Sequence, residues 1–277
     1  MPHQWTSDRA DCNEELVEVP EAALLTERYP SVRLLGLEFA DFDTETAATW
    51  LAQRPAAAPF GYVTTPNADH LARLARHPEL APIYQNAIMQ LLDSRVVART
   101  ARLAGLAAPR VAPGSDLTEL LLTRHVPVGE QVTIIGLRPQ WLLPLVARCG
   151  ITPPAHYDPP LGFESNPASL RVAVDFVLAN PSRFVFLAVG SPRQEILAAA
   201  IAATGRATGI GLCIGASLEF LAGAAKRAPV WMQRAGLEWL HRLQGNPRRL
   251  ARRYLRDCPS VFPMLLAERL RVCRRSG

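Results

Sequence analysis

The chain has 277 residues, of which 49% are hydrophobic and 20% are charged. This composition excludes wholesale disorder, and the length allows one large domain or one domain with an appendage. No apolar run reaches the roughly 18 residues that a membrane-spanning helix needs, and the acidic, polar residues 1–21 are unlike a secretory signal. The five cysteines are scattered without zinc-ligand spacing, so we expect no disulfide framework and a reducing, cytoplasmic location.

The net charge of +5 is distributed unevenly along the chain. Residues 226–277 contain 13 of the 30 Lys+Arg residues and 3 of the 25 Asp+Glu residues. The rest of the chain contains the other 17 basic and 22 acidic residues. A neutral-to-acidic body with a basic tail predicts a polyanionic partner, which can be nucleic acid, anionic lipid or a phosphorylated substrate.

Predicted strands and helices alternate at short spacing through most of the chain. In chain order, the patterns favour strands at 33–39, 61–65, 131–135, 184–189 and 208–214, an apolar stretch at 88–92, a loop at 157–162, and helices at 44–53, 96–106, 117–123, 141–147, 167–179 and 194–204, with two more after Asn67 and Pro78. The alternation predicts an α/β fold with a Rossmann-like, largely parallel sheet flanked by helices. We therefore expect an acidic lead-in at 1–30, an α/β domain at 31–229 and a basic, amphipathic helical appendage at 230–277.

One stretch combines a predicted buried strand with the start of a helix. The apolar run at 184–189 is followed by Gly-Ser-Pro, in which Ser191 is predicted to cap the next helix and Pro192 to occupy its first position. Arg193 and Gln194 then stand in the first helical turn, beyond the carboxyl end of the strand, where helix N-termini favour anions. This pattern predicts a phosphate or diphosphate site; the alternative is an ordinary capped βα unit.

Other polar side chains follow predicted strands or precede the basic tail. Residues 64–69 (TTPNAD) can bind a substrate hydroxyl or base, or can simply cap the following helix. Asp93 closes the apolar stretch and can act as a general base in a cleft, or as a helix cap paired with Arg95. Lys226 and Arg227 can contact phosphate or remain solvated.

Several motifs with known chemistry are absent from the sequence. It contains no GxGxxG after a strand, no GxxxxGK[ST], no GxSxG and no HExxH, and its six histidines do not cluster. The Asp-x-Asp pair at 41–43 precedes a helix and fits capping better than metal binding. We therefore expect no protein-held divalent metal.

Five segments together resemble the WecG/TagA/CpsF glycosyltransferases. They are TPNADHL at 65–71, LLD at 91–93, PPLGF at 159–163, GSPRQE at 190–195, and the long basic segment at 222–255. The resemblance implies an inverting, metal-independent and cofactor-free α/β enzyme. It implies transfer of a hexose or N-acetylhexosamine from a UDP-sugar to a polyprenyl-diphosphate-linked acceptor, in exopolysaccharide or cell-wall polymer synthesis. It also implies peripheral association with the anionic inner face of the cell membrane.

The resemblance also assigns roles to individual residues. Asp93 matches the position of the proposed catalytic base. Two positions depart from the family pattern, with Ser94 where glycine is frequent and Glu219 where aspartate is common. The expected substrate-binding residues are Thr65, Asn67, Arg193, Gln194, Glu195, Lys226, Arg227, Arg248, Arg249, Arg252 and Arg253, of which the last four match arginines that reach the acceptor diphosphate.

The basic tail leaves two alternative functions and two alternative structures open. The protein can be a nucleic-acid-binding protein that stacks bases on Trp231, Trp239 and Tyr254, or a non-catalytic nucleotide-sugar binding protein. A near-helical spacing favours a packing face instead and leads us to expect no nucleic-acid partner; the residues with this spacing are Trp231, Leu237, Leu240 and Leu243. The tail can lie on an anionic bilayer, or pack on the sheet with a solvated basic face. A homo-oligomer is also left open.

Overall fold

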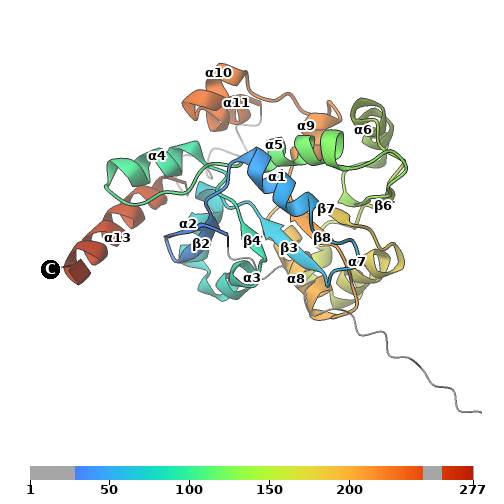
Figure 1. Ribbon diagram of the computed structural model, residues 1–277, viewed down its shortest axis with the longest axis horizontal. Coiled ribbons are helices and arrows are strands. Elements are labelled where there is room, and N and C mark those ends of the chain that lie inside the picture. The colour runs from blue at the N-terminus through green and yellow to red at the C-terminus, as the bar shows by residue number, and fades with distance from the viewer. Residues whose placement is uncertain (1–28, 246–257, 277) are drawn as a thin grey trace, which may run out of the picture.

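The computed structural model describes residues 29–245 and 258–276. Its centre is a six-stranded parallel sheet in the order β4-β3-β8-β7-β5-β6, with helices on both faces (Figure 1). The strands are β3 (Gly61–Thr64), β4 (Met89–Gln90), β5 (Thr133–Gly136), β6 (Ala155–Tyr157), β7 (Phe184–Ala188) and β8 (Ile210–Cys213). This architecture confirms the predicted Rossmann-like α/β fold.

The described helices agree closely with the predicted alternation. They are α1 (Thr44–Ala52), α2 (Ala68–Arg76), α3 (Ala81–Gln85), α4 (Arg95–Leu103), α5 (Gly114–Leu120), α6 (Leu142–Cys149), α7 (Pro167–Ala179), α8 (Arg193–Ala203), α9 (Ser217–Leu221), α10 (Val230–Ala235), α11 (Glu238–Gly245) and α13 (Val261–Ser276). Asp43 caps α1 by accepting a hydrogen bond from the Thr46 N–H at 2.9 Å, as the Asp-x-Asp pattern predicted.

Strand β7 shows how the sheet is buried on both faces. Phe184 and Phe186 pack with α1, α5, α6 and α9, whereas Val185 and Leu187 pack with α7 and α8 on the opposite face. Residues 184–187 are fully buried, because alternate side chains of a covered parallel strand enter two different cores.

One predicted strand was wrong, and one short strand was missed. The segment predicted as one strand at 33–39 is an antiparallel hairpin of β1 (Ser31–Leu34) and β2 (Leu37–Ala40), separate from the main sheet. Leu35 and Gly36 both have positive φ, as a two-residue turn between right-twisted strands requires. The edge strand β6 was not predicted, because three residues after two prolines carry too short a pattern.

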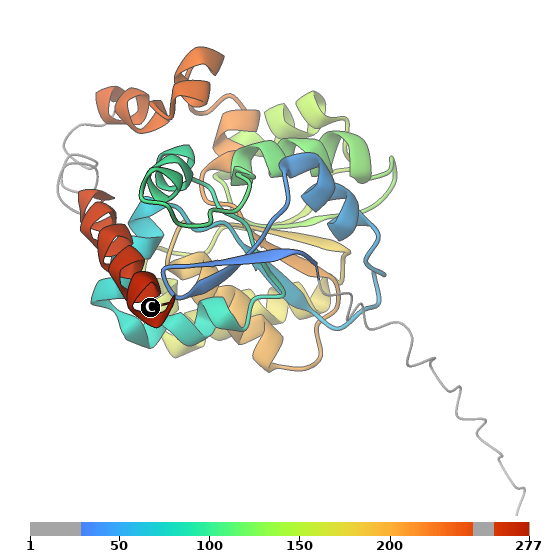
Figure 2. The same cartoon turned by 60° about the vertical axis from the view of Figure 1, so that its left-hand side comes forward.

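The C-terminal helix α13 packs onto the α/β body in the described structure. Val261 and Leu265 are buried in a cluster with Leu34 and Leu37 of the hairpin, and α13 lies alongside α2 and α4 (Figure 2). Glu268 Oε2 accepts a hydrogen bond from the Leu35 N–H at 2.8 Å. The predicted domain boundary near residue 230 stays a prediction, and the inner face of α13 is part of the core.

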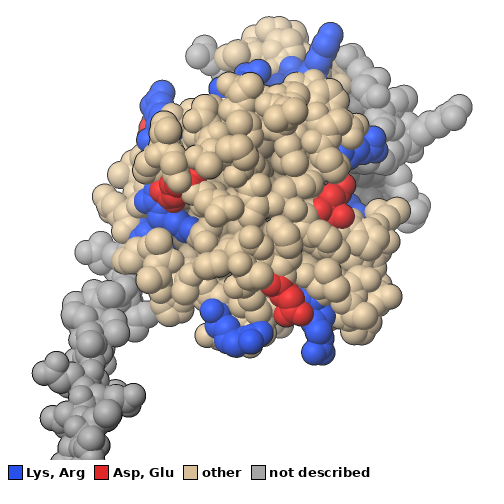
Figure 3. Space-filling view, turned by 90° about the vertical axis from the view of Figure 1, so that its right-hand side faces the viewer, with Lys and Arg blue, Asp and Glu red and all other residues tan. Residues whose placement is uncertain are grey.

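The end of the molecule opposite α13 carries few charged side chains. In the described residues visible in Figure 3, basic and acidic side chains are interspersed over a largely uncharged surface.

Among residues 29–245 and 258–276, no helix combines the length and apolar character required to span a bilayer.

Candidate functional site

The predicted site segments lie along the carboxyl edge of the sheet. Asn67 follows β3, Asp93 follows β4 and Arg193 follows β7, and these strands all run parallel. In open α/β sheets this edge is where ligands bind, so the topology gathers the candidates from three distant parts of the sequence.

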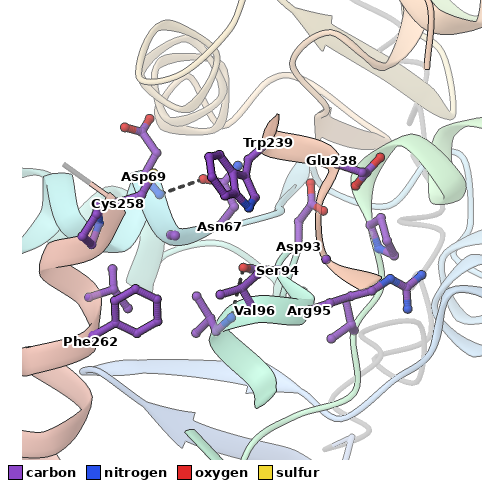
Figure 4. A pocket seen from close by; sticks show the side chains of 17 residues that line it. Asn67, Asp69, Asp93, Ser94, Arg95, Val96, Glu238, Trp239, Cys258 and Phe262 are labelled. Carbon is purple, nitrogen blue, oxygen red and sulfur yellow. Dashed lines mark hydrogen bonds between the residues drawn. The ribbon is translucent and has the colours of Figure 1, made fainter. Parts of the chain in front are cut away.

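A pocket of about 410 Å³ lies at this edge, beneath the C-terminal segment. Asn67 and Asp93 of the α/β body line it, together with Glu238 and Trp239 of α11 and Phe262 of α13. Figure 4 shows the Asp93 carboxylate directed toward the α11 side chains. The pocket is therefore closed by two regions that are more than a hundred residues apart in the sequence.

A backbone hydrogen bond to the neighbouring loop holds Asp93 at the pocket. Its N–H donates to the Pro66 carbonyl at 2.9 Å, which extends the β3–β4 pairing beyond the strands. Ser94 caps α4, because its Oγ accepts from the Val97 N–H at 3.2 Å. The alternative of Asp93 as the helix cap is wrong, since the neighbouring serine fills that position.

Asn67 caps α2, as one of the two interpretations of the TTPNAD segment predicted. Its Oδ1 accepts from the Asp69 N–H at 3.0 Å and the His70 N–H at 3.4 Å. His70 Nδ1 accepts from the Asn67 N–H at 3.1 Å, which completes a capping box. A ligand in the pocket would therefore meet the amide Nδ2 of Asn67 as a donor.

Thr65 joins two strands instead of lining the described pocket. Its side chain is buried, and Oγ1 donates to the Cys213 carbonyl of β8 at 3.1 Å. A Cβ on Gly114 would lie 2.9 Å from Thr65 Oγ1, so only glycine allows this close approach of α5. The geometry gives Thr65 a structural role, and its contact with substrate stays a prediction.

Gln194 and Glu195 form a buried link between loops. Gln194 Nε2 donates to Glu195 Oε1 at 2.9 Å, and Gln194 Oε1 accepts from the Gly215 N–H at 2.8 Å. Glu195 Oε1 also lies 3.7 Å from His70 Nε2. Burial raises the pKa of the Glu195 carboxyl above its ordinary value, and the hydrogen bond from Gln194 opposes that rise. These contacts position the loops after β3, β7 and β8, outside the pocket wall.

The predicted cap at Ser191 was wrong. Helix α8 begins at Arg193 with Pro192 in the cap position and no side-chain capping bond, and the Ser191–Pro192 peptide is cis. Ser191 Oγ instead accepts from Arg73 Nη1 at 2.7 Å, and Arg73 Nη2 donates to Asp69 Oδ2 at 2.7 Å. Ser191 therefore fastens the GSP turn to α2, a long-range contact that local sequence cannot reveal.

The basic candidates before the tail have different surroundings. Lys226 is exposed. Arg227 forms an ion pair with Asp116 and lies 3.9 Å from Glu119 and 3.8 Å from Glu238, so carboxylates surround its guanidinium. It does not line the described pocket. The remaining arginine candidates, Arg248, Arg249, Arg252 and Arg253, lie outside the described residues.

Two charged pocket residues were missed from the sequence. Arg95 and Glu238 both line the pocket that contains Asp93. The position of Arg95, two residues after Asp93, could have indicated that it lies in the pocket. Glu238 is far from Asp93 in the sequence and reaches the pocket only because of the path that the chain takes after the last strand. Within the described residues, no three His, Cys, Asp or Glu side chains are grouped as metal ligands.

A comparison with protein families matches nearly the whole described chain. The model of the glycosyl transferase WecG/TagA/CpsF family matches residues 32–275. This span includes both the α/β body and the C-terminal helices, and thus both sides of the pocket.

Proposed function

The chain belongs to the glycosyl transferase WecG/TagA/CpsF family, and we propose that it transfers a hexose or N-acetylhexosamine from a UDP-sugar to a polyprenyl-diphosphate-linked acceptor. The reaction inverts the anomeric centre, needs no metal, and serves exopolysaccharide or cell-wall polymer synthesis. The observation that carries this proposal is the pocket in which Asp93 faces the C-terminal segment.

In the proposed reaction, Asp93 is the general base. Its carboxylate takes the proton of the acceptor hydroxyl while that oxygen bonds to the anomeric carbon. The bond from this carbon to the UDP oxygen breaks, and the electron pair leaves with UDP. Base catalysis by a positioned side chain contributes roughly 10²- to 10⁴-fold.

Negative charge that develops on the departing diphosphate needs cationic partners. Arg95 lines the pocket, and Arg193 lies in the first turn of α8, at the positive end of the helix dipole. We assign both to the donor diphosphate, and the arginines at 248–253 to the acceptor diphosphate. Preorganised charges of this kind stabilise a transition state without reorganisation during the reaction.

The outer face of α13 supports association with an anionic membrane. Leu266 and Leu270 are 59% and 62% exposed and lie four residues apart, so they form one apolar stripe. Arg269 and Arg271 are exposed beside it. Apolar stripes flanked by basic residues favour the bilayer interface, with about 1 kcal/mol for each nearby basic residue.

The enzymatic part of the proposal is tested by offering the purified chain a panel of UDP-sugars and a short prenyl-diphosphate acceptor. Mass spectrometry should detect one glycosylated acceptor and equimolar UDP, with metal chelator present. Failure of every UDP-sugar to yield a product would overturn the proposed donor class.

The membrane part is tested by sedimentation with anionic and neutral vesicles. We expect the wild type to sediment with anionic vesicles and Leu266→Gln with Leu270→Gln to remain in solution. Equal partitioning of the two proteins would refute docking through α13.

A further inference from the structure

The C-terminal segment contributes two adjacent side chains to the pocket whose roles are not explained by the general base or the diphosphate. We propose that α11 provides the sugar-binding face of the site, with Glu238 accepting hydrogen bonds from ring hydroxyls and Trp239 covering an apolar face of the ring. Arg227 is the positioning residue that keeps α11 in place. This inference rests on the proposed function and specifies which residues recognise the sugar.

The chemistry of the pair fits a pyranose ring. An ionised carboxylate is an acceptor only, and it can bind two hydroxyl donors at once. The indole of tryptophan is flat and apolar, and suits the C–H face of a ring. Glu238 and Trp239 lie in the first turn of α11 and line the same pocket as Asp93 (Figure 4). A ring held there lies beside the proposed base.

Arg227 connects α11 to the α/β body through charge. Its Nε lies 3.8 Å from Glu238 Oε1, while its Nη2 pairs with Asp116 on α5. Because this contact uses Oε1, the second carboxylate oxygen of Glu238 can accept from a ligand.

A second attachment fixes the start of α11 against α4. Gly236 has a φ of +79°, and a Cβ at this position would lie 3.1 Å from Val96 Cγ2. Arg99 Nη1 donates to the Ala235 carbonyl at 2.9 Å. Helix α4 begins two residues after Asp93, so the same helix positions the base and the turn that leads into α11.

The test compares Glu238→Gln and Trp239→Leu with the matched control Glu119→Gln. Glu119 also approaches Arg227 but does not line the pocket. We expect Glu238→Gln to raise KM for one sugar substrate roughly 10- to 100-fold, as expected for a lost hydrogen bond to a charged group, while kcat changes less. Trp239→Leu should raise the same KM, and Trp239→Phe should have a KM close to the wild-type value. Glu119→Gln should behave as wild type.

The substrate whose KM rises identifies the sugar. A rise for the UDP-sugar alone assigns the face to the donor, and a rise for the acceptor alone assigns it to the acceptor glycan; both outcomes support the inference. Unchanged KM values for both substrates in Glu238→Gln and Trp239→Leu would overturn it. For Arg227, we expect Arg227→Ala to raise the same KM and Arg227→Lys to restore part of it; no KM change in Arg227→Ala would remove its positioning role.

A binding measurement separates failure of this inference from failure of the proposed function. If the wild type transfers no sugar, the proposed function is wrong, and saturation-transfer NMR with free hexoses and N-acetylhexosamines then tests the face directly. Binding that is lost in Glu238→Gln and Trp239→Leu but kept in Glu119→Gln would support it. Absent binding to the wild type, or equal binding to all variants, would refute it.

Discussion

Two hollows lined by described residues lie at opposite edges of the same sheet, and they differ in what their polar groups do. The hollow at the carboxyl edge, of about 410 Å³, contains Asp93 and is closed by α11 and α13. The hollow at the amino edge is larger, about 780 Å³, and is lined by segments that precede β3, β5, β7 and β8. Volume alone does not select the carboxyl edge.

Arg183, one of the two arginines that line the amino-edge hollow, is occupied by structural contacts. Arg183 donates to both carboxylate oxygens of Glu130 at 2.9 and 2.8 Å, and to the carbonyls of Ala52 and His125 at 3.0 and 2.8 Å. At the carboxyl edge, backbone bonds and caps hold the loops, and the Asp93 carboxylate is directed toward the α11 side chains that line the pocket. The direction of the polar groups therefore marks the candidate site, and volume does not.

The largest effect that we expect is from Asp93→Asn. The substitution keeps the size of the side chain and removes the base, so kcat should fall roughly 10²- to 10⁴-fold while UDP binding and thermal stability stay unchanged. Steady-state kinetics measures kcat, and calorimetric titration measures UDP binding. Asp69→Asn, which alters another pocket carboxylate, is the control and should lose much less; near-normal turnover in Asp93→Asn would exclude the base role.

Arg183→Met should lower the stability of the protein and leave its catalysis unchanged. It removes four charged hydrogen bonds at the amino edge and leaves Glu130 without its partner. We expect the free energy of unfolding to fall by about 1–3 kcal/mol in chemical denaturation, with unchanged kcat and KM for the folded protein. A selective loss of transfer at full stability would instead place function at the amino edge.

A smaller effect is expected from Thr65→Val, which keeps the shape of the side chain and removes its hydroxyl. The lost bond to the Cys213 carbonyl should reduce the free energy of unfolding by about 1 kcal/mol. Urea denaturation measures the difference. If Thr65 contacts substrate as the family resemblance implies, KM rises as well; a purely structural role leaves KM unchanged.

The smallest effect concerns Glu195 and pH. Burial raises the pKa of this carboxyl in the folded state above its ordinary value of 4.5, so the folded protein binds the proton more tightly than the unfolded chain. The contribution to stability is therefore present at low pH and lost as the pH rises through the folded pKa. Relative to Glu195→Gln, the wild type should lose thermal stability as the pH rises above the ordinary carboxyl pKa of 4.5. A difference in Tm that stays constant as the pH rises from this value would contradict the prediction.

The sequence predicted the periodic elements well and the long-range contacts poorly. The buried strand β7 and the helix α7 follow from uninterrupted apolar patterns and a clear Asn-Pro cap, which are local signals. Ser191 was assigned to a cap because serine before proline usually fills that position, but Arg73 from α2 competes for its hydroxyl.

The candidate site was predictable only where a strand positions it. Asp93 and Asn67 end adjacent parallel strands, so their proximity follows from topology. Gln194 and Glu195 carry a recognisable motif, yet their side chains turn into a buried network that only the packing of three loops creates. Glu238 depends on the path of the chain after the last strand, for which the sequence offers no local signal.

Photolabelling tests most directly whether the carboxyl-edge pocket binds the sugar substrate. A UDP-sugar analogue with a diazirine on the sugar is irradiated with the protein, and the labelled peptides are mapped by mass spectrometry, with excess unmodified UDP-sugar as competitor. We predict competed labels within residues 93–97 and 236–239. Competed labels within residues 52–57 and 181–183 would place the sugar at the amino edge and contradict the account.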